Sequence, residues 1–188
     1  MRGDLVCWLG LVWACGSAAL VGAQTSRPAV VPRIAAVDLA GDWYEAATSG
    51  SFALRRCLSD TRHALVRRSE RTLEVRTACV TNRGVERRRG FLEVGKAGDG
   101  RLSMRYAPLV LSWAPAAWSD FWVLDVGDGW MVVGDRDRRF LAVWSRTVAL
   151  DESALARAIA SARAAGFDPG VLRGVSQPAG PSGLIAGR

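Results

Sequence analysis

The feature that most constrains this chain is a series of short stretches of alternating polar and apolar residues, separated by turn signals. Residues 72–80 (TLEVRTACV) and 101–106 (RLSMRY) alternate, so that each would show one dry and one wet face. Tight-turn sequences lie at Asn82–Gly84, Gly98–Gly100 and Gly127–Gly129. Eight or so strands at hairpin spacing in about 110 residues predict an all-β, up-and-down antiparallel barrel, because closure removes exposed strand edges.

One helix is predicted after the last strand. Asp151 would cap it, Glu152 suits its positive end and Gly166 would end it. Its apolar stripe is narrow and alanine-rich, which favours close packing on the barrel wall: Leu155, Ala158, Ile159 and Ala162. Four segments are expected: a leader at 1–23, a linker at 24–35, a barrel with its helix at 36–177 and a loose Gly- and Pro-rich tail at 178–188.

The N-terminal run Leu5–Ala23 carries no charge, follows Arg2 and ends in the small residues of a peptidase site. Three interpretations stay open. The run is a cleaved secretory signal, a lipoprotein signal of residues 1–14 cleaved before a lipidated Cys15, or an uncleaved anchor. The first two place the protein in the periplasm or at the outer membrane.

Export would leave Cys57 and Cys79 in an oxidising compartment. A hairpin turn near Arg68 lies midway between them, so the two cysteines would face each other across antiparallel strands and form a disulfide. The alternative is two unpaired buried thiols. A zinc site is not expected, because His63 is the only histidine.

Charge is concentrated in one part of the chain. Residues 55–101 hold thirteen basic and six acidic side chains. Their excess of positive charge, +7, equals the net charge of the whole chain. Such a basic strip suits anionic lipid headgroups, although a solvated β face is the alternative. Nucleic acid is not an expected partner, because the chain has an export signal and no reading motif.

The motifs LAGDWYEAA, SDFWVLDV, MVVGD and RFLAVWSRT, followed by a helix ending in AGFDPGVL, occur in the order seen in lipocalins. The chain most resembles the bacterial outer-membrane lipocalin group, which is similar to apolipoprotein D. The resemblance covers roughly residues 37–177. It implies an eight-stranded barrel in which Gly41 allows a tight turn, Trp43 plugs the closed end and Arg146 stacks on the indole. Asp120 stands where the second lipocalin motif has an aspartate.

The resemblance also implies that the protein binds a small hydrophobic molecule, such as a fatty acid or a lysophospholipid. No cofactor or metal is expected. The cavity candidates are large or adaptable side chains, although each could instead simply fill a core: Met104, Tyr106, Trp122, Phe140 and Trp144. Trp113 and Trp118 lie among prolines and are expected in a loop at the barrel mouth or against a membrane.

Two other functions stay open: a structural envelope protein with a filled barrel and, less favoured, an enzyme. Asp60, His63 and Ser69 are close in sequence, but no activated nucleophile is evident. His63 is expected on the surface beside exposed arginines. The chain is therefore not expected to be an enzyme.

Overall fold

The structure is a computed structural model that describes residues 26–50, 57–106, 109–111 and 113–177. The leader with Cys15 and the tail at 178–188 lie outside the described residues. The strands are β1 (Gly41–Thr48), β2 (Ser59–Arg67), β3 (Thr72–Thr81), β4 (Gly84–Val94), β5 (Arg101–Arg105), β6 (Ser119–Gly127), β7 (Trp130–Gly134), β8 (Leu141–Ser145) and β9 (Arg173–Gly174). The helices are α1 (Ala36–Leu39) and α2 (Glu152–Ala164), with 3₁₀ turns η1 (Leu109–Leu111), η2 (Pro115–Ala117) and η3 (Pro169–Val171).

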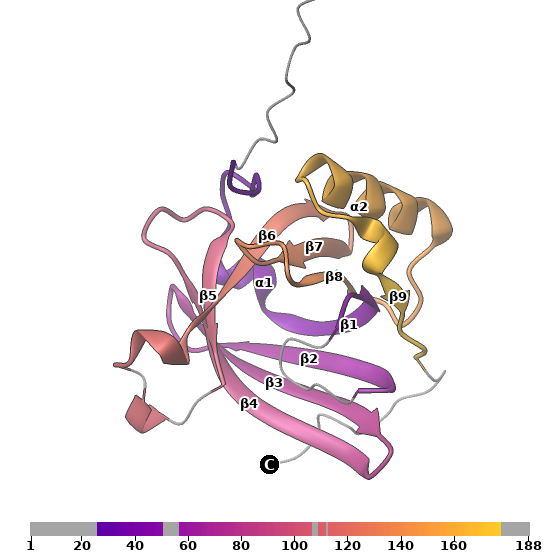
Figure 1. The fold of residues 1–188 in the computed structure, drawn as a ribbon. Coiled ribbons are helices and arrows are strands. Elements are labelled where there is room, and N and C mark those ends of the chain that lie inside the picture. The colour runs from indigo at the N-terminus through magenta and orange to yellow at the C-terminus, as the bar shows by residue number, and fades with distance from the viewer. Residues whose placement is uncertain (1–25, 51–56, 107–108, 112, 178–188) are drawn as a thin grey trace, which may run out of the picture.

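Strands β1 to β8 form a closed antiparallel barrel (Figure 1), as the alternation predicts. Each strand pairs with the next one in sequence, and β1 pairs with both β2 and β8, which closes the sheet. The short β9, which the sequence did not predict, pairs with Ala47 and Thr48 at the edge of β1 from which β2 has separated. The expected eight-stranded up-and-down barrel with a C-terminal helix is confirmed.

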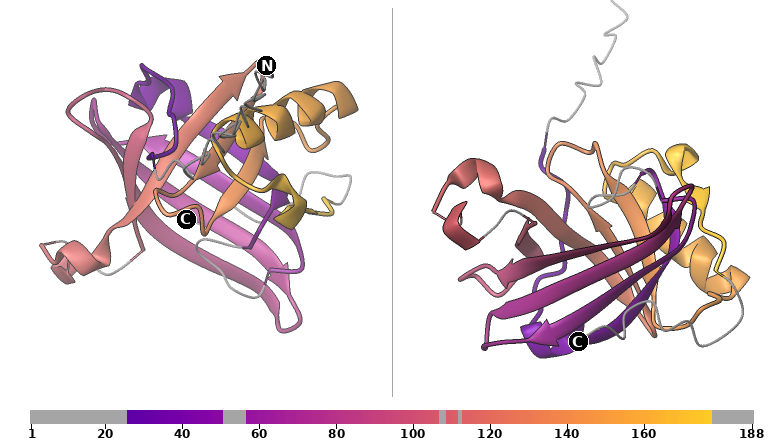
Figure 2. Two further views of the ribbon diagram at one scale, coloured as in Figure 1. Left: turned by 45° about the horizontal axis from the view of Figure 1, so that its top comes forward. Right: turned by 90° about the horizontal axis from the view of Figure 1, so that it is seen from below.

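The two faces of the barrel wall are covered differently. α2 packs on the outside of β6, β7 and β8, on the opposite side of the barrel from the projecting η1 and η2 turns (Figures 1 and 2). Every residue of β7 and β8 is therefore buried. In this half of the barrel, the expected pattern of one dry and one wet face does not hold, because the helix replaces water on the outer face.

The ends of α2 follow the prediction, but its buried stripe is shifted. The Asp151 carboxylate accepts a hydrogen bond from the Ala154 amide, and Gly166 ends the helix with a φ of +83°. Bonds to the Ser153 hydroxyl and the Ala154 amide lower the pKa of Asp151. The residues packed most deeply are alanines, at Ala154, Ala158 and Ala162, whereas Leu155 and Ile159 are only half-buried. Small side chains let the helix axis approach the wall closely.

The β2–β3 hairpin contains the predicted disulfide, with a different turn. Cys57 and Cys79 are bonded, with Cα atoms 5.6 Å apart. The turn occupies residues 68–71 and Arg67 pairs with Leu73, so the hairpin centre lies two residues beyond the predicted position. An irregularity between Ser59 and Arg62 shifts the pairing by one residue, and Cys57 precedes β2 instead of pairing within it.

The barrel has a closed end and an open end. α1 and the β2–β3, β4–β5 and β6–β7 turns lie at the closed end, and the β3–β4 turn with η1 and η2 lies at the open end. Residues expected in a linker pack against the barrel: Val31 and Ile34 are buried, and the Val31 and Ile34 amides donate to carbonyls of Val123 and Gly98.

Candidate functional site

The closed end contains the stacked pair expected from the lipocalin motif. The Arg146 guanidinium lies 3.6 Å from the centre of the Trp43 ring, and the Trp43 indole donates to the Leu39 carbonyl at 2.8 Å. Gly41 has a φ of +106°, and a Cβ atom there would lie 2.9 Å from Arg146 Nη1. Glycine is therefore required two residues before the tryptophan, both for the turn and for the close approach of the arginine.

Arg146 also ties the barrel to the segment that precedes it. Its guanidinium donates to the carbonyls of Asp38 at 2.9 Å and Asp42 at 3.3 Å. These contacts connect β8 to α1 and the start of β1. The pair is a structural element of the closed end and offers no reactive group.

Arg146→Ala should lower the free energy of unfolding by about 1 to 3 kcal/mol, because it removes a stacked cation and two hydrogen-bond donors. Denaturant unfolding followed by tryptophan fluorescence measures this. Arg157→Ala on the exposed face of α2 is the matched control and should change stability by about 0.5 kcal/mol or less. Equal midpoints for Arg146→Ala and the native protein would show that the stack does not hold the closed end together.

The barrel interior is packed with apolar side chains from all eight strands. Those from the described residues form one continuous cluster: Trp43, Leu65, Leu73, Val75, Leu92, Val94, Leu102, Met104, Phe121, Val123, Met131, Val133, Ala142 and Trp144, with Phe140 beside β8. Leu65, Leu73, Leu92 and Leu102 are near the closed end, and each is at most 2% exposed. Side chains therefore fill this half of the barrel.

A row of polar side chains crosses the interior above this packed half. His63 stacks on Trp144, with ring centres 3.8 Å apart and planes 11° from parallel. Its Nδ1 is hydrogen-bonded to the Thr77 hydroxyl at 2.9 Å, and that hydroxyl is bonded to the Tyr106 hydroxyl at 2.9 Å. Burial raises the pKa of Tyr106 above its ordinary range, and the bond to Thr77 offsets this only in part, so the phenol stays neutral.

His63 therefore does not lie on the surface, and that prediction was wrong. The alternation of β2 places it on the inner face, directly opposite Trp43 in β1 and Thr77 in β3. Its neighbour Arg62 is on the outer face, with its guanidinium over the Tyr44 ring. Sequence periodicity separates the two faces of a strand, but it does not say which one is inside.

Glu45 completes the polar row from the other side of His63. Its side chain is 2% exposed, and its Oε2 atom lies 3.6 Å from His63 Nε2, too far for a hydrogen bond. Among the residues that the structure describes, Glu45 Oε1, Thr61 Oγ1, His63 Nε2 and Trp144 Nε1 are buried without a hydrogen-bond partner. Buried polar atoms normally have partners, so this cluster is the most unusual feature of the interior.

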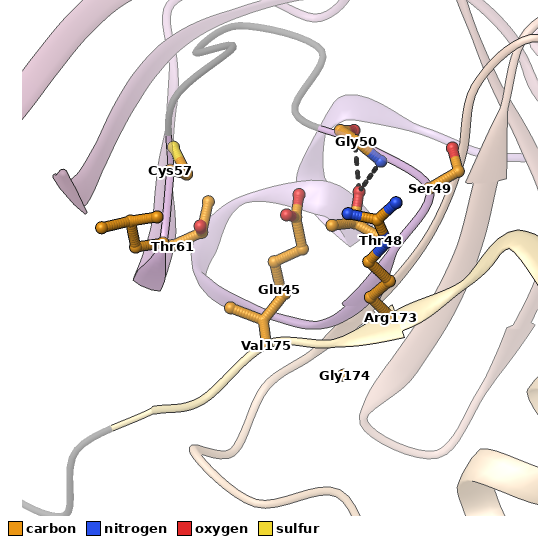
Figure 3. A pocket seen from close by; sticks show the side chains of 10 residues that line it. Glu45, Thr48, Ser49, Gly50, Cys57, Thr61, Arg173, Gly174 and Val175 are labelled. Carbon is orange, nitrogen blue, oxygen red and sulfur yellow. Dashed lines mark hydrogen bonds between the residues drawn. The ribbon is translucent and has the colours of Figure 1, made fainter. Parts of the chain in front are cut away.

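A pocket opens beside Glu45, where β1 and β2 separate. The two strands pair only as far as Tyr44 and Arg62, and beyond that point the Gln177 amide bridges them by donating to the carbonyls of Glu45 and Thr61. The pocket has a volume of about 330 Å³. Figure 3 shows Glu45 in its centre, between Thr61 and Cys57 on one side and Thr48 and Arg173 on the other.

The row also aligns a hydroxyl, an imidazole and a carboxylate: Thr77, His63 and Glu45. Thr77 is 1% exposed and its hydroxyl already bonds both His63 and Tyr106. A nucleophile must reach the substrate, and this hydroxyl cannot. The arrangement therefore favours binding over catalysis.

The predicted cavity residues divide into two groups. Met104, Phe140 and Trp144 belong to the interior cluster, and Tyr106 packs against it. Trp122 does not line the interior, which corrects the prediction: it lies on the outer face with Leu124, in the cluster under α2. Its neighbour Phe121 is the inward residue, with its ring centre 5.2 Å from that of Trp144.

The other predicted residues lie toward the open end. Asp120, at the start of β6, forms an ion pair with Arg136 at 3.3 Å. Trp113 is 80% exposed, between the η1 and η2 turns, whereas Trp118 lies 5.0 Å from the Arg105 guanidinium. Of these two tryptophans, Trp113 is the one exposed enough to contact a membrane surface. Cys15, the lipidation candidate, lies outside the described residues.

The outer wall of β2 to β4 has a carboxylate surrounded by arginines. Glu74 is fully buried and accepts hydrogen bonds from Arg68, Arg76 and Arg89. Burial raises its pKa, but the bonds from Arg89, Arg76 and Arg68 outweigh this effect and hold the pKa at about 2. The predicted wet face is thus partly dry, because half-exposed arginines cover the acid.

Within residues 26–50, 57–106, 109–111 and 113–177, no group of three or more His, Cys, Asp or Glu side chains could hold a metal ion. No helix of this described part is long and apolar enough to span a membrane.

Solved structures with this architecture share the fold at low sequence identity. Lobster apocrustacyanin A1 is 16% identical, with a TM-score of 0.59 over 80% of this chain and 92% of its own. Insecticyanin from the tobacco hornworm Manduca sexta is 14% identical, with a TM-score of 0.61 over 81% and 85%. The siderocalin Ex-FABP is 18% identical, with a TM-score of 0.56 over 76% and 96%.

A closed eight-stranded barrel with a stacked Trp–Arg pair at one end and a helix on its wall defines the lipocalin fold. Residues 36–177 match the family described as "Lipocalin-like domain", and the chain belongs to this family. Lipocalins generally bind small hydrophobic ligands and are not generally enzymes. No curated protein sequence matches the chain significantly.

Proposed function

We propose that this protein binds one single-chain amphiphile, a fatty acid or a lysophospholipid, and transports or stores it in the bacterial cell envelope. The observation that carries the proposal is the cluster of buried polar atoms without described partners in an otherwise apolar barrel. A fully structural core would satisfy such groups or replace them by apolar ones. A bound molecule with a polar group would satisfy them.

The open end supports the orientation of such a molecule. Arg88 pairs with Thr77, so it is on the inward face of β4, and its side chain is 53% exposed. Arg87 and Arg89 flank it on the outer face. An anionic carboxylate or phosphate would find a basic rim there, while acyl carbons contact Phe140 and Trp144 inside.

The same end would meet a membrane. Val110 and Trp113 are 74% and 80% exposed on the projecting turns between β5 and β6. Exposed apolar side chains near arginines suit the interface of an anionic bilayer. Lipidation of an exported protein at Cys15 would add a covalent anchor. Binding, with no catalytic step, is the proposed activity, because Thr77 is inaccessible.

Affinity should rise with acyl chain length and then reach a plateau. Each added methylene that is buried contributes at most about 0.8 kcal/mol, until the space is full. Fatty acids and lysophospholipids of increasing length, titrated against the delipidated protein by calorimetry, test this. Trp144→Phe should weaken binding, whereas Trp122→Phe, on the outer face, should not.

Native mass spectrometry of the purified protein would identify any amphiphile that purifies with it. If no chain length gives saturable one-to-one binding, the barrel is a filled structural element and the proposal is wrong.

A further inference from the structure

The pocket between β1 and β2 contains hydrogen-bond acceptors in a place where an acyl chain would leave them unsatisfied. Glu45 Oε1 and Thr61 Oγ1 are buried without partners among the described residues, and both residues line the pocket. An unpaired buried carboxylate is costly, because it loses its hydration and gains no donor. The missing partner is therefore a group rich in hydrogen-bond donors.

Nearby side chains of the described part do not supply that group. Gln177 uses its amide nitrogen on the backbone carbonyls of Glu45 and Thr61, and His63 Nε2 is too far from the carboxylate at 3.6 Å. Arg173 also lines the pocket (Figure 3), and its side chain forms no ion pair with a described residue. The pocket thus combines a buried carboxylate with a cation at its exposed side.

From this geometry we infer that the pocket binds an ammonium group of the ligand at Glu45. The inference rests on the proposed function and narrows it. A lysophospholipid whose headgroup combines a primary ammonium with a phosphate fits, because its N–H donors would meet Glu45 and Thr61 and its phosphate would lie toward Arg173. A fatty acid does not fit this pocket, since its carboxylate would face the Glu45 carboxylate.

Trp144 lies next to this carboxylate but outside the pocket lining. Glu45 pairs with Trp144 in the β1–β8 register, and the indole ring stacks against His63. The described residues of the pocket therefore favour a positive group in two ways: by the charge of Glu45 and by the acceptors Glu45 Oε1 and Thr61 Oγ1.

The test compares three probes with the same twelve-carbon chain and different ends: dodecylammonium, dodecanol and dodecanoate. Each is titrated at pH 7, below its micelle concentration, into the delipidated full-length protein. We expect dodecylammonium to bind at least about tenfold more tightly than dodecanoate, with dodecanol between them. Glu45→Gln should reduce the ammonium-to-carboxylate ratio by about tenfold.

Two further variants separate a local contact from general charge. Glu93→Gln removes an exposed carboxylate from the outer face of β4 and should leave the ratio within about twofold of the native value. Thr61→Val removes one acceptor without changing charge, and it should weaken dodecylammonium binding while dodecanoate binding stays the same. Thermal unfolding verifies that each variant is folded; Glu45→Gln should be at least as stable as the native protein, since it removes an unpaired buried charge.

Equal or tighter binding of dodecanoate, or an unchanged ratio in Glu45→Gln, would overturn the ammonium site and leave the proposed function intact. An equal loss of the ratio in Glu93→Gln would also overturn it, because the preference would then reflect net charge. If none of the three probes binds saturably, both the ammonium site and the proposed function fail.

Discussion

Replacement of both Cys57 and Cys79 by serine should lower the free energy of unfolding by about 3 kcal/mol. The disulfide joins residues 22 positions apart, and in the chain-entropy model a loop of this length restricts the unfolded chain by that amount. The bond also holds the segment that leads into β2 against β3. Urea unfolding of the oxidised native protein and of the double variant measures the difference.

The native protein in a reducing buffer is the matched control, since it loses the bond and keeps both sulfur atoms. It should unfold at nearly the same urea concentration as the double variant. Peptide mapping without reduction should recover the Cys57–Cys79 pair. Quantitative alkylation of both thiols in the native protein would show that the bond does not form.

Glu74→Gln should lower the free energy of unfolding by about 2 to 3 kcal/mol at pH 7. The change removes the negative charge that three arginines share and turns an amide donor toward guanidinium donors. The loss is smaller than for a fully buried ion pair, because Arg68, Arg76 and Arg89 are half-exposed and can hydrate. Urea unfolding measures it.

The same carboxylate should give the native protein an acid-dependent loss of stability. Its folded-state pKa of about 2 lies below the ordinary value of 4.5, so its contribution is complete above pH 4.5 and is lost as the pH falls toward 2. Between pH 5 and pH 2, the free energy of unfolding should therefore fall less in Glu74→Gln than in the native protein. Glu93→Gln, an exposed acid on β4, is the control and should leave the pH profile unchanged. A parallel profile for Glu74→Gln and the native protein would contradict the arginine cluster.

The periodic pattern predicted the barrel well because it depends on local alternation. Strand positions, the capped helix and the Trp43–Arg146 contact all follow from short-range signals or from the ordered motifs. The assignment of Trp122 to the interior failed for a specific reason. Alternation puts Trp122 and Phe121 on opposite faces, but both faces of β6 are buried, and the amphipathicity that distinguishes inside from outside is lost under α2.

The polar row could not be predicted in the same way. Glu45 shares the parity of Trp43, which is a usable signal for an inward side chain, but its meeting with His63 depends on the register of β1 against β2. A bulge after Glu45 then turns Ala47 outward, which the sequence does not reveal. The arginines beside His63 in the sequence suggested that it lies on the surface. Sequence neighbours on a strand face opposite directions, so the suggestion was misleading.

The bridge made by Gln177 determines when the pocket can exist. Its amide joins Glu45 and Thr61, residues 132 and 116 positions earlier in the chain, and Arg173 and Gly174 pair with β1 beside it. Contacts over such separations form late, because they require closure of very long loops. During synthesis, β1 to β8 emerge before the segment that holds Arg173, Gly174 and Gln177. The pocket beside Glu45 is therefore complete only when almost the whole barrel has been translated.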